Sequence, residues 1–359
     1  MSIHGNPIVD ELFAPGSSKV CLSEISKRNI LTVEGEHAAV LIHSLVTSDV
    51  TKKLFGEGTK KPKSYNTQPA LFLSAKGRVL FDTILSVELD SEGKVKNNNR
   101  IYIEHDASQT EELVKHLKTH ILRKKVTMQT FKNDFGEQSE APVAKIFSLF
   151  GSSMMSPNKT KLPYKWKSES VVSIRDPRLS SLGFRIYCTF KSQSEYDQFK
   201  QAVQDEMKNH LVLDNDATIY ERVRLLSGIP ENSTDAPSEV AFPLELGFEQ
   251  IGGIHFDKGC YIGQELTTRT YHRGEIRKRF LIVRGETLPD PGTELQFSGE
   301  KTESMRSEKA GRMGSHDDAI GLALVKFEPI FQSQTEGEIT VSAEGGKPLK
   351  FVQPYWLTL

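Results

Sequence analysis

The spacing of apolar residues in the first part of the chain predicts short strands followed by a helix. Apolar-rich runs at 19–25 and 28–35 have the length and composition of strands, and we expect these two strands to pair with each other. In residues 36–50 the apolar positions recur with the period of a helix. These positions are Ala38, Leu41, Ile42 and Leu45. We therefore expect a strand pair that leads into a helix.

A second group of elements in the same order follows. After a connection at 52–69 that is rich in Lys, Gly and Pro, the segments 77–89 and 100–106 predict a hairpin. Ser108 and Glu111 have the spacing of a capping box, which predicts the start of a helix. The apolar positions of this helix are Leu113, Leu117 and Ile121.

A third group completes the pattern. A loose stretch at 132–169 precedes two predicted strands, 171–176 and 183–190, and Ser192 with Glu195 predicts a capped helix after them. Strand pairs that alternate with helices are typical of an α+β fold of the ferredoxin-like kind, rather than of strict βαβ units.

The pattern changes near residue 278. Residues 217–230 predict one more helix upstream of this point, whereas short strands at close, regular spacing follow it and predict a small β-barrel or sandwich. We therefore expect a region of two intertwined α+β subdomains at 19–278 and a C-terminal β-barrel domain at 279–359. The predicted barrel strands are 279–285, 292–298, 310–315, 320–328, 337–342 and 347–352.

Composition argues against several classes of protein. With 359 residues, 37% of them hydrophobic, the chain can form two or three packed units. A formal net charge of −1 gives no overall basic field for nucleic acid, so such a partner is not favoured. No apolar run approaches the roughly 20 residues of a membrane span. Asp10 and Glu11 do not fit a transit peptide, so we expect a soluble chain with no targeting segment as given.

The three cysteines are far apart and do not form a C-x-x-C pair. Cys21, Cys188 and Cys260 therefore predict neither a zinc site nor a disulfide framework, and they favour a reducing compartment. Cys21 and Cys188 stand in apolar strand-like runs, where a free cysteine acts as a small hydrophobic residue. A four-thiolate cluster could not be held by this chain alone.

Cys260 lies in a different setting, the segment KGCYIGQEL at 258–266. Gly259 and Gly263 permit a tight turn that would expose the sulfur, and Lys258 is two residues away. Nearby cations lower the pKa of a thiol below its free value of about 8.5. The cations that follow are Arg269, Arg273, Arg277, Lys278 and Arg279. Cys260 is thus a candidate for a reactive or metal-binding thiol, and a loop cysteine with no role is the alternative.

Two other polar features have both a structural and a functional interpretation. Asp82 interrupts an apolar row of its predicted strand, and a buried carboxylate needs a partner, so Asp82 pairs with an internal Arg or binds a polar ligand. Spacing alone favours the ion pair. His116 and His120 lie four apart on a predicted helix, but no Glu completes an H-E-x-x-H pattern, so a half-buried helix face is favoured over a metal site.

The nine residues KGCYIGQEL, with AFPLELGF before them and TTRTYHRGEIRKR after them, resemble the signature of the folate-binding proteins related to the aminomethyltransferase (T-protein) of the glycine cleavage system. Within that superfamily, the chain is similar to the mitochondrial iron-sulfur cluster assembly factor and to its bacterial folate-binding regulator. The match also includes KGRVLFD, HILRKKV, DPRLSSLGFRIY, YERVRLLSGIPE and AGRMGS, and it covers roughly residues 19–327 in consistent order.

The resemblance implies an aminomethyltransferase-like fold, with subdomains around a central channel that holds tetrahydrofolate in the enzymes. It implies that Asp82 contacts the pterin and that cations hold the glutamate tail. Two departures stand out: Ser180-Ser181-Leu182-Gly183 replaces the Gly-Glu-Asp-Gly segment of the enzymes, and Cys260 is added. The implied cofactor-binding residues are Asp82, Arg224, Lys258, Gly259, Gly263, Gln264, Glu265 and Arg277.

Three functions follow as hypotheses. The first is an assembly factor for [4Fe-4S] proteins in the mitochondrial matrix, monomeric on its own, in which Cys260 shares a [2Fe-2S] cluster with an A-type scaffold protein. The alternative is a tetrahydrofolate-dependent one-carbon transferase, with Asp82 as polar catalyst and Cys260 as accessory group or nucleophile. A weaker hypothesis takes HRGEIRKR, residues 272–279, as an RNA-binding patch.

Overall fold

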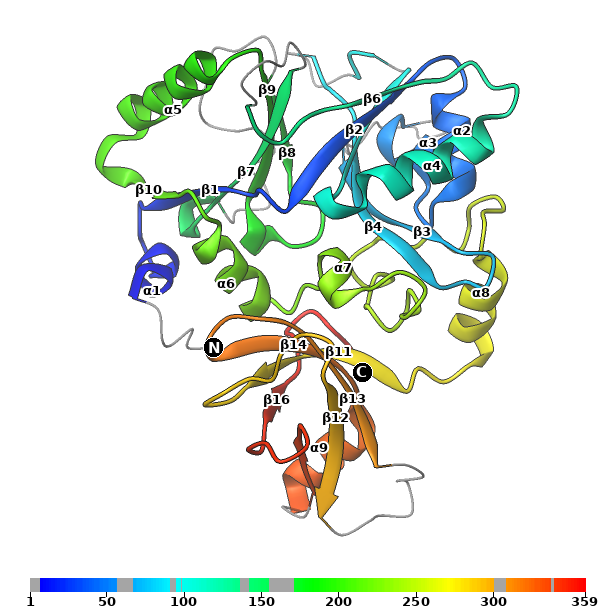
Figure 1. The fold of residues 1–359 in the computed structure, drawn as a ribbon, viewed down its shortest axis with the longest axis vertical. Helices are drawn as coiled ribbons and strands as arrows, with labels where there is room; N and C mark the ends of the chain where they lie inside the picture. Colours follow the sequence, from blue (N-terminus) through cyan, green and yellow to red (C-terminus); the bar gives the residue numbers. More distant parts are fainter. Residues whose placement is uncertain are drawn as a thin grey trace.

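The computed structural model contains three β-sheets with helices packed around them, in the part of the chain that it describes (Figure 1). The described residues are 7–56, 67–90, 95–97, 99–135, 142–154, 171–299, 308–336 and 339–359. Two five-stranded sheets occupy the upper part of Figure 1, and a six-stranded sheet occupies the lower part. The helices α6 (Thr218–Leu226) and α7 (Asn232–Asp235) lie between them. The predicted α+β architecture is confirmed.

The first sheet brings together strands that are distant in sequence. Its strand order is β10-β1-β7-β9-β8, with β1 parallel to β10 and antiparallel to β7. Helix α5 (Gln193–Met207) buries Tyr196, Phe199 and Val203 in the same apolar cluster as this sheet. The strands are β1 (Val20–Glu24), β7 (Val143–Phe150), β8 (Val171–Arg175), β9 (Phe184–Phe190) and β10 (Leu211–Asp214).

The second sheet has the order β3-β4-β5-β2-β6. The predicted hairpin is confirmed, because β4 and β5 are antiparallel neighbours. The predicted pairing of 19–25 with 28–35 is wrong, because β1 and β2 belong to different sheets. Strand β7 is the antiparallel partner of β1 and lies within the stretch that we expected to be loose. The strands are β2 (Arg28–Glu34), β3 (Thr67–Leu73), β4 (Val79–Ser86), β5 (Arg100–Asp106) and β6 (Thr127–Thr130).

Two helix caps were predicted from the sequence, and the structure confirms one of them. The Ser192 hydroxyl accepts the Glu195 N–H at 3.3 Å, so the cap of α5 is confirmed. The capping box at Ser108 is wrong, because a short 3₁₀ turn precedes the helix and Asp106 accepts the Ser108 N–H at 2.9 Å. The other helices described before the barrel are α1 (Pro7–Phe13), α2 (Ala38–Leu45), α3 (Val50–Leu54), α4 (Thr110–Ile121) and α8 (Gln264–Arg273).

The C-terminal strands form a nearly closed barrel in the order β15-β12-β13-β14-β11-β16. A bridge between Val341 and Leu349 brings its two edges together. All six predicted strands are present, and α9 (Phe327–Glu336) is an addition that the sequence pattern did not predict. The strands are β11 (Lys278–Arg284), β12 (Glu294–Gly299), β13 (Lys309–His316), β14 (Ile320–Lys326), β15 (Ile339–Ser342) and β16 (Lys350–Val352).

One apolar cluster connects the three sheets. It contains Leu71 of the second sheet, Ile146 of the first and Leu322 of the barrel, all buried. The indole Nε1 of Trp356 donates to the Ser227 carbonyl at 2.7 Å and ties the end of the chain to the end of α6. The barrel is therefore packed against the rest of the protein. Among the described residues, no helix is long and apolar enough to cross a membrane.

Candidate functional site

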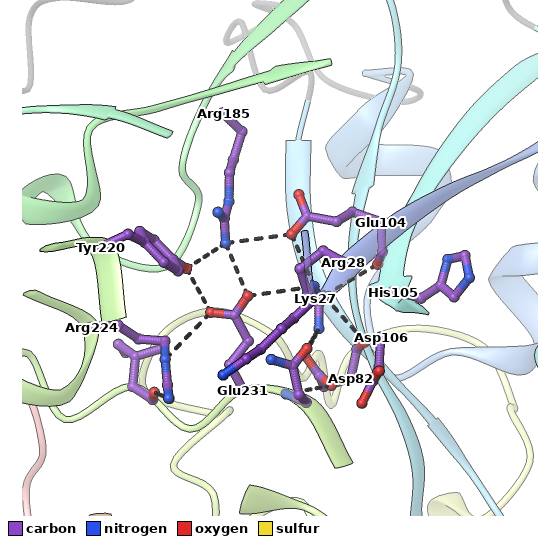
Figure 2. A network of polar contacts seen from close by, with 12 residues as sticks. Lys27, Arg28, Asp82, Glu104, His105, Asp106, Arg185, Tyr220, Arg224 and Glu231 are labelled. Atoms are coloured by element: carbon purple, nitrogen blue, oxygen red, sulfur yellow. Dashed lines mark hydrogen bonds and ion pairs between the residues drawn. The ribbon is translucent and has the colours of Figure 1, made fainter. Parts of the chain in front are cut away.

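A buried network of charged side chains lies where the sheets approach one another (Figure 2). At its centre, Arg28 donates from Nη1 to Asp82 Oδ2 at 2.6 Å and to Asn232 Oδ1 at 3.1 Å. Its Nε donates to Glu104 Oε1 at 3.1 Å, and Glu231 Oε1 lies 3.4 Å from the same nitrogen. One guanidinium at the start of β2 thus compensates carboxylates from β4, from β5 and from the residue before α7.

Glu231 extends this network to the first sheet and to α6. Arg185 of β9 lies 3.2 Å from Glu231 Oε1, and the Tyr220 hydroxyl donates to Oε2 at 2.6 Å. Burial alone would raise the pKa of Glu231, but Arg178, Arg185 and other arginines around it hold that pKa well below its usual value. Glu231 is therefore a charged, buried residue that connects the two five-stranded sheets and α6.

Asp82 does not fit the pterin contact that the resemblance implies. Its Oδ2 is bonded to Arg28, and its Oδ1 accepts the Asn232 backbone N–H at 3.1 Å. Burial raises the pKa of Asp82, and the Arg28 charge opposes that rise. Because the carboxyl is only 7% exposed, a pterin could reach it only by displacing Arg28. The arrangement fits the internal ion pair.

The cations that were expected beside Asp82 do not converge on it. Arg224 belongs to the same network, but its guanidinium donates hydrogen bonds to Glu221 Oε2 at 2.7 Å, to Asp235 Oδ2 at 2.8 Å and to a backbone carbonyl. Arg277 is on the surface, where its Nε lies 3.0 Å from Glu275. Lys258 points elsewhere, as described below. The described residues therefore do not form the folate lining that the resemblance implies.

A cleft of about 800 Å³ opens between the two five-stranded sheets. Tyr102 of β5 and Tyr187 of β9 line it, and the Tyr187 hydroxyl donates to Glu104 Oε2 at 3.0 Å. Tyr187 thus connects the lining of the cleft to the buried network. None of the candidate site residues from the sequence lines this cleft.

Cys260 is exposed, whereas Cys21 and Cys188 are buried. Burial raises the pKa of Cys21 to about 12 and also raises the pKa of Cys188, so both stay protonated thiols at physiological pH. The expected contrast between one accessible thiol and two structural ones is confirmed. No group of three or more His, Cys, Asp or Glu side chains in the described part of the chain could hold a metal ion.

Lys258 fixes the loop that carries Cys260. Its ammonium donates to the carbonyls of His43 at 2.6 Å, Val46 at 2.6 Å and Ser48 at 2.9 Å, all at or just beyond the end of α2. It also lies 4.8 Å from the centre of the Tyr261 ring. Burial lowers the pKa of Lys258 to about 7. An ammonium has three N–H donors, and here each of them has an acceptor.

Gly263 sets the other end of this loop. Its φ is +79°, a conformation that glycine adopts without strain, and it is the residue from which α8 begins. A Cβ at this position would lie 2.5 Å from the Ser74 carbonyl oxygen. The loop therefore packs directly on the turn between β3 and β4. At Gly259 a Cβ would come no closer than 3.8 Å, to a ring nitrogen of His43.

Gln264 and Glu265 are the first two residues of α8 and lie away from the buried network. Together with Tyr261, Arg269 and Arg273 they line a shallow groove of about 880 Å³ along this helix. The nine-residue segment therefore builds a surface site around Cys260, separate from the buried network around Asp82.

Comparison with known proteins agrees with this fold. Residues 277–359 match the family model of the CAF17 C-terminal β-barrel domain. The structure is similar to the glycine cleavage system aminomethyltransferase T of Bartonella henselae, with a TM-score of 0.64 at 12% identity, covering 94% of this chain and 86% of that one. The chain therefore has the aminomethyltransferase-like fold.

Sequence comparison is more specific. The chain is 28% identical over 348 residues to the mitochondrial iron-sulfur cluster assembly factor IBA57 of Homo sapiens, covering 96% of this chain and 87% of that protein. It is 29% identical over 318 residues to IBA57 of Mus musculus, and the match covers 88% of this chain and 80% of that protein. Among proteins compared by sequence, the chain is similar to these assembly factors. This confirms the resemblance that the sequence motif indicated.

Several residues of the site were not predicted from the sequence. Arg28 and Glu231 organise the buried network, but each stands in an ordinary-looking segment. The sequence did contain one sign of the network, which is the charged residue Arg28 at the start of an apolar strand. If that strand is buried, the Arg28 side chain needs a buried partner. The three carbonyl contacts of Lys258 had no signal in the sequence, since backbone acceptors can belong to any residue.

Proposed function

We propose that this protein is an iron-sulfur cluster assembly factor of the mitochondrial matrix that acts in [4Fe-4S] protein maturation. In this proposal Cys260 supplies one thiolate to a [2Fe-2S] cluster that is shared with an A-type scaffold protein. The names of the similar proteins, which are mitochondrial iron-sulfur cluster assembly factors, support the general role and the organelle.

The exposed position of Cys260 is the observation that carries the proposal. The thiol is accessible on a loop held by Lys258 at one end and by Gly263 at the other. A fixed position limits the entropy that the loop would lose when the sulfur binds iron. Cys21 and Cys188 are buried with raised pKa values, so neither is available as a thiolate.

One thiolate is too few for a cluster, so the other ligands have to come from a partner. Iron in these clusters takes soft sulfur ligands, and the chain offers a single accessible one. Binding is a ligand exchange in which the Cys260 thiol loses its proton, its sulfur bonds to iron and another ligand leaves that iron. A cluster held in this way by two proteins is easily passed on.

The proposal is tested by anaerobic mixing with an A-type scaffold that carries a [2Fe-2S] cluster. We expect the wild-type protein to form a coloured complex that co-elutes on gel filtration, and Cys260→Ala to form none. The matched control is the double variant Cys21→Ala/Cys188→Ala, which retains Cys260 and should still give the complex. Equal colour in the Cys260→Ala complex would refute this role of the thiol.

The tetrahydrofolate-dependent transferase has less support. It requires Asp82 to be free for a pterin, and both Asp82 oxygens are engaged by Arg28 and Asn232. If the transferase were nevertheless right, calorimetry would detect tetrahydrofolate binding that weakens sharply in Asp82→Asn.

A further inference from the structure

Helix α8 presents an unusual outer surface beside Cys260. Thr267 is its only buried residue, and the last turns expose Arg269, Tyr271, His272 and Arg273. Tyr271 is 49% exposed, although it is a large aromatic residue. Figure 1 places α8 at the edge of the molecule, with its outer side facing away from the sheets and the barrel. Five of the ten residues of this helix are exposed, so half of its side chains are available for a partner.

An aromatic stack connects this surface to the thiol loop. The rings of Phe256 and Tyr271 are 3.8 Å apart at their centres and inclined by only 15°, and His272 packs edge-on against Phe256. Phe256 lies four residues before Cys260, so the loop runs back along the helix. Tyr261, the neighbour of Cys260, lines the groove beside α8 together with Arg269 and Arg273. A protein that reaches Cys260 therefore also meets α8.

The charge of this surface specifies the chemistry of the partner. Arg269 and Arg273 are exposed and form no ion pair with any described residue, although Glu265 is one helical turn before Arg269. Arg269 and Arg273 are four residues apart and project from the same side of α8, where both line the groove with Tyr261 and His272. Cations that have no described ion partner, beside a partly apolar groove, suit a protein face with carboxylates around an apolar centre. Such charges mainly raise the rate of encounter and fix the orientation of docking.

The same residues do not form a continuous track for RNA. Arg277 is already paired with Glu275, and Arg279 is buried with its Nη1 2.8 Å from Glu249. The run HRGEIRKR at 272–279 is therefore interrupted by acidic and buried positions. Tyr271, the exposed aromatic residue just before this run, is stacked on Phe256, which leaves little platform for successive bases.

We propose that Arg269 and Arg273 of α8, with the groove that they line, form the docking surface for the acidic face of the partner protein that supplies the remaining thiolates of the shared cluster. This inference rests on the proposed function and adds to it the surface and the charge of the partner. Cys260 then serves as the ligand, and α8 as the recognition element. The two roles are separable, because Cys260→Ala should lose the coloured complex that survives gel filtration and keep only a weaker, salt-dependent affinity that is measured by titration.

The test measures the affinity of the full chain for the cluster-loaded A-type scaffold, anaerobically, at low and at moderate salt. We expect Arg269→Glu/Arg273→Glu to weaken binding about tenfold or more and to remove most of its salt dependence, because screening acts on exposed charges. The matched control, Lys118→Glu/Arg123→Glu, makes the same change of charge on exposed positions of and after α4 and should bind as wild type.

The outcomes separate the two proposals. Wild-type affinity in the α8 double variant overturns the docking surface, and the cluster proposal then stands if colour still requires Cys260. A coloured Cys260→Ala complex that survives gel filtration as the wild-type complex does overturns the cluster proposal, whatever α8 does. Binding of a labelled single-stranded RNA that exceeds scaffold binding, and that is lost in the α8 double variant, would also overturn the proposal, since the surface would then serve nucleic acid.

Discussion

The ammonium of Lys258 meets three backbone carbonyls at the end of α2, so the residue two positions before Cys260 is fixed from three directions. Helix C-termini leave carbonyls unsatisfied, and a cation there is stabilised by both the hydrogen bonds and the helix dipole. These contacts explain why a lysine stands at position 258, and the explanation needs no bound ligand. The position of the thiol is thus set by its neighbour rather than by its own contacts.

Replacing Lys258 by Met should loosen the thiol loop. Met has a similar length but donates nothing, so the three carbonyls lose their donor and the loop loses its attachment to α2. We expect faster amide hydrogen exchange over 256–263 and a clear loss of complex formation with the scaffold, while exchange in the barrel stays unchanged. Lys118→Met, at an exposed position of α4, is the control. Unchanged exchange in Lys258→Met would show that the loop is held by other contacts.

At the scale of the element, α8 depends on the turn that starts it. Gly263 combines a left-handed backbone with close contact to the turn between β3 and β4. The helix itself buries a single side chain, so its orientation comes from the Gly263 turn before its first residue and from the stack of Tyr271 on Phe256. The two attachments lie at opposite ends of the helix.

Gly263→Ala should therefore disturb both α8 and the thiol loop. An added Cβ would lie 2.5 Å from the Ser74 carbonyl oxygen, in addition to the strain of φ +79° in an L-residue. Gly16→Ala is a matched control, because Gly16 has φ +78° and no atom within 4 Å of its Cβ position. We expect the control to lose about 1–2 kcal/mol of unfolding free energy, and Gly263→Ala to lose more, in urea titrations. Equal losses would mean that the close contact is unimportant.

At the scale of the whole molecule, buried polar groups tie the units together. Glu231 and its arginines link the two five-stranded sheets, and Arg224 reaches the barrel through Ser315 at 2.7 Å. Removing one member of such a network leaves uncompensated charge in the interior, which is strongly destabilising. The region around Asp82 that the resemblance assigns to a pterin is, in this chain, a structural junction.

Acid should destabilise the whole protein before its carboxylates reach their ordinary pKa range. Burial lowers the pKa of His105, His116 and His255 to about 4 each, whereas an unfolded histidine titrates near 6.5. Between these values the unfolded state binds more protons, so stability falls as the pH falls from about 6.5 to about 4. The slope is at most about 1.4 kcal/mol per pH unit for each histidine, and less for the partly exposed His116 and His255.

The contribution of one histidine can be isolated with His116→Leu. His116 packs edge-on against the rings of Phe72 and Phe81, so an apolar side chain suits the site. We expect the variant to gain stability relative to wild type as the pH falls from 7.5 to 5, measured by urea titration. If the difference in unfolding free energy between the variant and wild type is constant over this pH range, the pH dependence does not come from His116. The same packing supports the interpretation of His116 and His120 as a half-buried helix face.

The sequence by itself determined the α+β class, the barrel strands, most helices and the exposed thiol in its glycine-flanked loop. These features depend on local periodicity and turn chemistry, which act over a few residues. Only the tertiary structure decided that β1 and β2 belong to different sheets and that Arg28 forms an ion pair with Asp82. It also decided that Lys258 attaches the thiol loop to α2 through backbone carbonyls. The reason is physical: a strand's neighbour and a buried charge's partner are chosen by distant segments that compete for the same hydrogen bonds.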